Sequence, residues 1–321
     1  RNLHNLSERI AADAKWLFRF EIIETPTKKY LFTDYSHLNS DGVSVEIVIE
    51  DIIAAYEGKS LEPEYYTMFE LGEFLSDFWE TKAGKRCIEL YLSLMDQAEG
   101  PAVFPPDQHN ETWQPRRLKT PLSADMAALK RYCDQNHLTV STVLAGAVGI
   151  VLAKYSGHKN AAYSYAFSGR TDSRLSNTVG YVATMMESFC FTKGQNTFWN
   201  YLQAYQKSMI NLMMFPMMPI VQVVGKYPQA IDVTYIYQPK ETLTYEMDGK
   251  SVRAIFLQEE MPNETVKVIF QAVEEQDNSI SWVVDYHGNL YSEPYMRRIV
   301  DDINATVEGI LKNEHMEKYL C

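Results

Sequence analysis

The chain has 321 residues, of which 46% are hydrophobic and 12% aromatic, so it is long and apolar enough for two lobes with packed cores. It carries 30 Lys and Arg residues against 42 Asp and Glu, and the net charge of −12 argues against a nucleic-acid-binding protein with a basic face. No apolar run reaches the roughly 18 residues that a membrane span needs, so no membrane partner is expected. The composition fits a cytoplasmic protein.

A strand pair and a helix are predicted around residue 37. The first predicted element is a helix over residues 5–19, where apolar residues recur at helical spacing. Strands are predicted over 18–24 and 29–35, with a turn at 25–28 that contains Pro26. A helix follows Gly42 and closes at Gly58, and two more are predicted over residues 65–83 and 85–97.

The stretch from residue 98 to residue 115 changes character. It holds four prolines together with Gly100, Asp107 and Asn110, a composition typical of a linker. We therefore predict two domains, a first lobe over residues 1–113 and a second over residues 114–321.

The second lobe is predicted to alternate helices and strands without a regular repeat. The predicted strands cover residues 117–120, 161–167, 231–237, 251–257, 265–274 and 279–286, and the predicted helices cover 124–136, 139–155, 198–214 and 292–313. This order indicates an α+β fold rather than a doubly wound parallel sheet.

His37 is the residue best placed for chemistry. It comes directly after a predicted strand and shortly before Asp41 and Gly42, ahead of a helix. An imidazole exchanges protons near neutral pH and suits general base catalysis on an amine or hydroxyl. Asp41 would hold the loop by a salt bridge or orient the imidazole, and the N–H of Gly42 is free to donate toward a developing oxyanion. The alternative interpretation is an ordinary strand-to-helix turn, since Asp-Gly is a common turn pair.

A family resemblance favours the first interpretation. Residues 36–42, Ser-His-Leu-Asn-Ser-Asp-Gly, resemble the HHxxxDG motif of condensation domains from nonribosomal peptide synthetases. Further blocks resemble the same family in the same order, namely residues 5–24, 54–58, 122–130, 138–144, 155–157, 166–170, 179–185 and 285–291. Several independent blocks in order are more specific than any one of them.

The resemblance implies a V-shaped pair of chloramphenicol-acetyltransferase-like lobes, a pseudo-dimer. A donor thioester and an acceptor amine would each arrive on the phosphopantetheine arm of a peptidyl carrier protein, with an adenylation domain adjacent. His37 would deprotonate or position the amine during amide formation, making the domain an acyltransferase of natural product biosynthesis. No bound cofactor is implied, because the thioester is already activated.

Two departures from the family pattern matter. Ser36 replaces the first histidine of the motif, at a position regarded as supporting rather than catalytic. The chain also begins at Arg1, partway into the first lobe, so that lobe is expected to be incomplete. The family's arginine that pairs with the motif aspartate falls in the absent segment, and Asp41 is therefore expected to lack its partner.

Other residues suggest weaker candidates. Arg170, in the Ser168-Gly169-Arg170 turn, is a candidate to line the cleft or bridge the lobes, or else a plain surface residue. The sequence also contains a methionine cluster that would form an acyl-pocket wall or simply fill the core, at Met209, Met213, Met214, Met217 and Met218. The four cysteines form no CxxC pair, so they predict neither a metal site nor disulfides, and we interpret them as buried thiols: Cys87, Cys133, Cys190 and Cys321.

Alternative functions remain open at this point. Within the same superfamily the chain could act in epimerization, in ester formation or as a coenzyme A-dependent acyltransferase. A noncatalytic domain that recruits carriers or partners, with a degenerate motif around Ser36, is an alternative of a different class.

Overall fold

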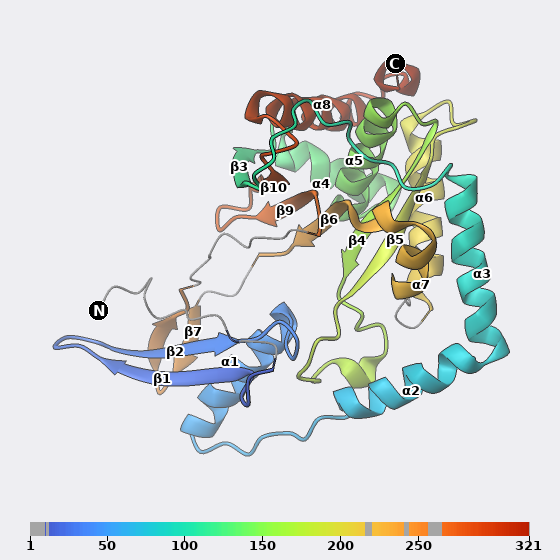
Figure 1. Ribbon diagram of the computed structural model, residues 1–321. Helices are drawn as coiled ribbons and strands as arrows, with labels where there is room; N and C mark the ends of the chain where they lie inside the picture. Colours follow the sequence, from blue (N-terminus) through green and yellow to red (C-terminus); the bar gives the residue numbers. More distant parts are fainter. Residues whose placement is uncertain (1–9, 11–12, 216–219, 241–243, 256–264, 321) are drawn as a thin grey trace. The chain divides into compact units, whose positions relative to one another are not determined.

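The computed structural model describes residue 10 and residues 13–215, 220–240, 244–255 and 265–320 (Figure 1). The chain forms two compact units, each built from three segments. Unit 1 comprises Arg1–Asp77, Ser168–Ala183 and Thr242–Glu259, and unit 2 comprises Phe78–Phe167, Thr184–Glu241 and Glu260–Cys321. The two units are divided at other positions than the predicted lobe boundary between residues 113 and 114. That boundary stays a prediction.

Unit 2 is built on a mixed six-stranded sheet in the order β3-β10-β9-β6-β4-β5. Its strands are β3 (Pro115–Pro121), β4 (Asn160–Phe167), β5 (Thr184–Phe191), β6 (Val233–Gln238), β9 (Val268–Glu274) and β10 (Ile280–His287). The pairs β6–β9 and β4–β6 are parallel and the others antiparallel. Its helices are α3 (Lys82–Gln97), α4 (Met126–Asn136), α5 (Val140–Ser156), α6 (Phe198–Met213), α7 (Ile220–Lys226) and α8 (Glu293–Leu311).

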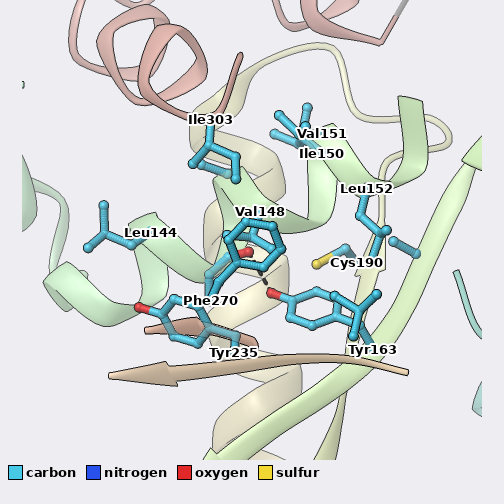
Figure 2. Packing of buried hydrophobic residues seen from close by; sticks show 14 of the residues in the cluster. Leu144, Val148, Ile150, Val151, Leu152, Tyr163, Cys190, Tyr235, Phe270 and Ile303 are labelled. Carbon is cyan, nitrogen blue, oxygen red and sulfur yellow. Dashed lines mark hydrogen bonds between the residues drawn. The ribbon is translucent and has the colours of Figure 1, made fainter. Parts of the chain in front are cut away.

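Helix α5 forms the centre of the unit 2 core (Figure 2). Its residues from Val143 to Ala153 are all buried, as expected for a helix that is apolar on every side. The Tyr163 hydroxyl of β4 donates to the Ala145 carbonyl at 2.6 Å, so this buried phenol is satisfied. A Cβ at Gly149 would stand 2.2 Å from the Cys190 sulfur, and this glycine therefore permits the close packing of α5 on β5.

The described part of unit 1 contains two hairpins and the helix that follows His37 in the chain. Strands β1 (Phe18–Glu24) and β2 (Lys29–Tyr35) pair antiparallel from Phe18↔Tyr35 to Glu24↔Lys29. Helix α1 (Gly42–Tyr56) follows, α2 (Met68–Glu80) begins in this unit, and β7 (Thr244–Met247) pairs with β8 (Lys250–Arg253). The described residues of unit 1 bury few apolar side chains, and its buried positions include the polar Ser40, Asp41 and Ser44.

The predicted helix over residues 5–19 is wrong where the structure describes it. Residues 13–17 contain no helix, and the last two predicted positions, Phe18 and Arg19, begin β1. Exposed Phe18, Phe20 and Ile22 alternate with half-buried residues along β1, so a period of two decides this segment. Residues 1–9, 11 and 12 lie outside the described residues.

The remaining predicted helices and strands are close to the observed ones. Helix α5 was expected over residues 139–155 and spans Val140–Ser156, with Thr139 as its N-cap and Gly157 in the left-handed region at its end. Across the described residues, no single helix has both the length and the apolar character to cross a membrane; only the bent pair α4 and α5 passes when the two are taken together.

Candidate functional site at the start of helix α1

His37 lies in the tight loop that connects β2 to α1. Strand β2 ends at Tyr35, and the loop closes on itself because the Ser40 hydroxyl donates to the Ser36 carbonyl at 3.0 Å. Asp41 then takes the N-cap position with extended backbone, and its Oδ1 accepts from the Ser44 N–H at 2.9 Å. A capping aspartate that accepts from the N–H three residues later is a common way to start a helix, so Asp41 fixes where α1 begins.

The His37 imidazole is held through one ring nitrogen. Its Nδ1 lies 2.7 Å from the Ser40 carbonyl oxygen, and a carbonyl can only accept a hydrogen bond. Nδ1 must therefore carry the proton, which leaves the lone pair of the neutral ring on Nε2. His37 is exposed, and its ring meets Tyr181 edge to face, with centroids 5.0 Å apart and planes at 87°.

The Asp41 carboxylate accepts six hydrogen bonds. Arg170 reaches it in a bidentate pair, with distances of 2.7 Å to Oδ2 and 3.1 Å to Oδ1. The N–H groups of Val182 and Ala183 donate to Oδ2 at 3.0 and 2.9 Å. The Ser44 N–H and hydroxyl donate to Oδ1 at 2.9 and 2.8 Å. Every lone pair of this buried carboxylate is thus used, and the carboxylate binds residues 170–183 to the start of α1.

The Asp41–Arg170 pair is almost fully buried, with side-chain exposures of 4% and 8%. Burial by itself raises the pKa of a carboxyl, but the hydrogen bonds from Arg170 and Ser44 outweigh it and lower the pKa of Asp41 below its ordinary value. The expectation that Asp41 lacks a partner is therefore wrong. Arg170 supplies the cation from within the chain, although the sequence suggested only a cleft-lining or lobe-bridging role for it.

Gly169 forms the turn that places Arg170 against Asp41. Its φ is +71°, in the left-handed region, and a Cβ there would stand 2.1 Å from the Val182 carbonyl oxygen. Both constraints exclude a larger residue.

Ser44 is a site residue to which the sequence interpretation gave no role. It is fully buried, and its hydroxyl lies 2.7 Å from the Gly180 carbonyl, which it can donate to in place of Asp41. The Ser44 hydroxyl oxygen also accepts hydrogen bonds, from the Gly180 N–H at 3.0 Å and from Arg170 at 3.2 Å. Its place three residues after the capping aspartate was the only signal in the sequence.

Gly42 is the first residue of α1 and is exposed. Apart from its two chain neighbours and the backbone of α1 itself, nothing in the described part of the chain lies within 4 Å of the place where its Cβ would stand. The N–H groups of Gly42 and Val43 have no acceptor among those residues and point along the positive end of the helix dipole. Ser36 sits at the opposite end of the loop, where its Oγ accepts weakly from the Leu38 N–H at 3.4 Å.

The weaker candidates lie elsewhere. Met209 is buried in α6, Met214 is 77% exposed, and Met217 and Met218 lie outside the described residues. Among the residues that the structure describes, no group of three or more His, Cys, Asp or Glu could hold a metal ion. Cys321 also lies outside them, whereas burial raises the pKa of the other three thiols to about 11, which leaves little thiolate at neutral pH: Cys87, Cys133 and Cys190.

Comparison with known proteins places this geometry in a family. The family model described as "Condensation domain" matches residues 3–318. The chain is 23% identical over 295 residues to surfactin synthase subunit 1 of Bacillus subtilis (strain 168), covering 88% of this chain but only 8% of that protein.

Solved structures share the fold. The condensation domain from the monacolin K polyketide synthase MokA matches with a TM-score of 0.75 at 14% identity, over 94% of this chain and 74% of that one. The epimerization domain from the third module of tyrocidine synthetase B matches with a TM-score of 0.68 at 14% identity, over 95% of this chain and 73% of that one. The predicted α+β, chloramphenicol-acetyltransferase-like fold is confirmed, and the chain belongs to the condensation-domain family, which is related to nonribosomal peptide synthetases.

Proposed function

We propose that this domain forms an amide bond between a donor acyl or peptidyl thioester and an acceptor amine, both tethered to carrier proteins through phosphopantetheine. The observation that carries the proposal is the state of His37. Its Nδ1 is committed to the Ser40 carbonyl, so the basic Nε2 of an exposed ring is left for substrate. Family membership supports the reaction class, and the ring supplies the base that the class requires.

In the proposed reaction, Nε2 of His37 takes a proton from the acceptor ammonium or orients the free amine. The amine nitrogen attacks the thioester carbon, and the C–N bond forms as the carbonyl oxygen becomes an oxyanion. The free N–H of Gly42, at the positive end of α1, donates to that oxygen. After the attack the nitrogen still carries a surplus proton, which Nε2 of His37 takes once the proton from the original ammonium has passed to water. Collapse then breaks the C–S bond, and the departing thiolate takes that surplus proton from the His37 imidazolium.

The proposed partners are donor and acceptor peptidyl carrier proteins and an adjacent adenylation domain, in the cytoplasm. The chain spans less than a tenth of the length of the synthase subunit that it matches, and in this proposal other parts of such an assembly would load and deliver the substrates. The domain itself binds no cofactor in this scheme, and the phosphopantetheine belongs to the carriers.

Replacing His37 with Ala is expected to lower the single-turnover rate of amide formation by at least ~100-fold, because it removes the proton acceptor. The measurement uses carrier-bound donor and acceptor thioesters and quantifies the carrier-bound product by mass spectrometry. His109→Ala, which removes an exposed histidine of unit 2, is the control and should react at the wild-type rate. An unchanged rate in His37→Ala would disprove the proposal.

Replacing Gly42 with Ala tests access to the helix N-terminus. The substitution should leave the melting temperature unchanged or slightly higher, since the added methyl meets no described atom and Ala favours helix. The rate should nevertheless fall by about 10-fold or more, because the methyl narrows the approach to the N–H that faces the oxyanion. A stable variant with the full rate would remove Gly42 from the mechanism.

One observation favours a second candidate, a noncatalytic recruitment domain: the motif has Ser36 where the family has a histidine. Such a domain would bind loaded carriers and yield no product. The epimerization alternative is separated by running the assay in D₂O, because α-carbon exchange would label the donor without forming an amide.

A further inference from the structure

Among the described residues, the His37 ring makes one hydrogen bond and one aromatic contact. Nδ1 meets the Ser40 carbonyl, and the ring meets the Tyr181 phenol at 87°. This half-buried hydrogen bond joins one ring atom to one oxygen and leaves the imidazole free to tilt about that line, so Ser40 alone does not keep the ring in one orientation. The perpendicular aromatic contact is the second restraint and limits rotation of the imidazole.

The backbone on both sides of Tyr181 is fastened to the first turn of α1. Before it, the Gly180 N–H donates to the Ser44 hydroxyl at 3.0 Å, and the Gly180 carbonyl oxygen lies 2.7 Å from the same hydroxyl, as an alternative acceptor to Asp41. After it, Val182 and Ala183 donate to Asp41 at 3.0 and 2.9 Å. The backbone next to Tyr181 is therefore held by buried hydrogen bonds of Gly180 and Val182, while the Tyr181 ring contacts His37.

Gly180 fixes the stretch from a third direction. A Cβ at this position would stand 1.8 Å from Met68 Cγ, so the backbone packs directly on the start of α2. Asp41 and Ser44 hold the backbone on either side of Tyr181, and the Tyr181 ring meets the His37 imidazole.

We infer that Tyr181 is a positioning residue, whose ring holds the His37 imidazole in the orientation that presents Nε2 to the acceptor amine. The inference rests on the proposed function and adds the residue that sets the geometry of its base. Burial, with the Asp41 charge as a smaller cause, raises the pKa of Tyr181, so the phenol stays neutral and does not compete with His37 for the substrate proton. The Tyr181 ring makes the contact with His37, and the Tyr181 hydroxyl has no hydrogen-bond partner within the described chain.

The test compares Tyr181→Phe, which keeps the ring, with Tyr181→Leu, which keeps bulk but not aromaticity. Tyr56→Leu, at an exposed position of α1, controls for the loss of a tyrosine from unit 1. The first readout is the imidazole ¹⁵N spectrum of histidine-labelled protein, assigned with His37→Ala. Wild type, Tyr181→Phe and Tyr56→Leu should show His37 as the Nδ1–H tautomer, and Tyr181→Leu should show averaged nitrogen shifts.

The second readout is the single-turnover rate. Tyr181→Phe should stay within about 3-fold of wild type, and Tyr181→Leu should fall about 10- to 100-fold with the concentration of acceptor carrier at half-maximal rate unchanged. A fixed tautomer in Tyr181→Leu, or a loss in Tyr181→Phe as large as in Tyr181→Leu, would overturn the inference. If wild type makes no amide while the spectra behave as expected, the proposed function fails and the positioning role of Tyr181 stands.

Discussion

Replacing Arg170 with Met is expected to lower the free energy of unfolding of the loop–helix junction in unit 1 by about 3–5 kcal/mol. This is the usual cost of leaving one member of a buried ion pair without its partner. Asp41 would keep its N–H donors but lose the only cation among its six donors, in a site where it is 5% exposed. The hydroxyl of Ser44 would lose a donor at the same time.

Hydrogen exchange measured by mass spectrometry reports this change locally. Amides of residues 42–48 and 180–184 should exchange faster in Arg170→Met, while those of α5 keep their protection. The control is Arg174→Met, which breaks an exposed pair with Asp172 and should leave the protection of both segments unchanged. The double variant Asp41→Asn/Arg170→Met should be less destabilised than the two single changes added together. Strict additivity would mean that the two side chains are not coupled.

The same pair predicts a response to acid. The pKa of Asp41 is lower in the folded state than its ordinary value, so its contribution is complete above the ordinary carboxyl range. Protection of residues 180–184 should therefore fall as the pH drops below about 4 and Asp41 is protonated. The Asp41→Asn variant should lack this acid transition.

Replacing Glu187 with Leu is expected to stabilise unit 2, in contrast to most core substitutions. Glu187 lies on β5, is fully buried, and has no hydrogen-bond partner for either carboxyl oxygen among the described residues. Ser164, its partner across the β4–β5 ladder, also has a buried hydroxyl with no hydrogen-bond partner in the described part of the chain. Burial raises the pKa of Glu187 to about 8.

The sign of the pH effect follows from that shift. A carboxyl with a folded pKa above its unfolded value binds its proton more tightly when folded, so wild-type stability declines as the pH rises from the ordinary carboxyl range through 8. By pH 7 the decline amounts to about 3 kcal/mol at 1.36 kcal/mol per unit. Urea unfolding of wild type and Glu187→Leu at pH 5, 6 and 7 should give a difference that grows with pH.

Glu187→Gln separates charge from shape. It keeps the unpaired polar group but cannot ionise, so it should remove the same pH dependence while gaining less stability than Leu at pH 5. A difference between wild type and Glu187→Leu that does not change with pH would show that Glu187 finds a partner for its charge.

The sequence was informative where local chemistry decides the structure. The apolar run of α5 lies between Thr139 and Gly157, which cap its two ends, so its limits could be placed within one residue. The position of His37 between a strand and a helix could be predicted for the same reason, since Asp41 caps the helix locally.

Long-range pairing could not be predicted in this way. Asp41 and Arg170 are 129 residues apart, and no spacing rule connects a turn arginine to one capping carboxylate. The contact between His37 and Tyr181 depends on that pairing and was missed with it. The helix expected over 5–19 failed differently, because residues 13–17 form no helix, whereas the strand predicted over 18–24 is observed as β1, paired with β2.

The dependence of the site on a distant arginine also bears on the order in which the chain folds. The segment Ser168–Ala183, which contains Arg170, lies in the chain between β4 and β5. Both of these strands belong to the sheet of unit 2. Bringing Arg170 to Asp41 across 129 residues of chain loses conformational entropy that one ion pair cannot offset. Pairing of β4 with β5 brings the two ends of the segment together first. We therefore expect the His37 loop to order late in folding, after the β4–β5 ladder has formed, so that a nascent chain lacks the Asp41–Arg170 pair until β4 and β5 are in place.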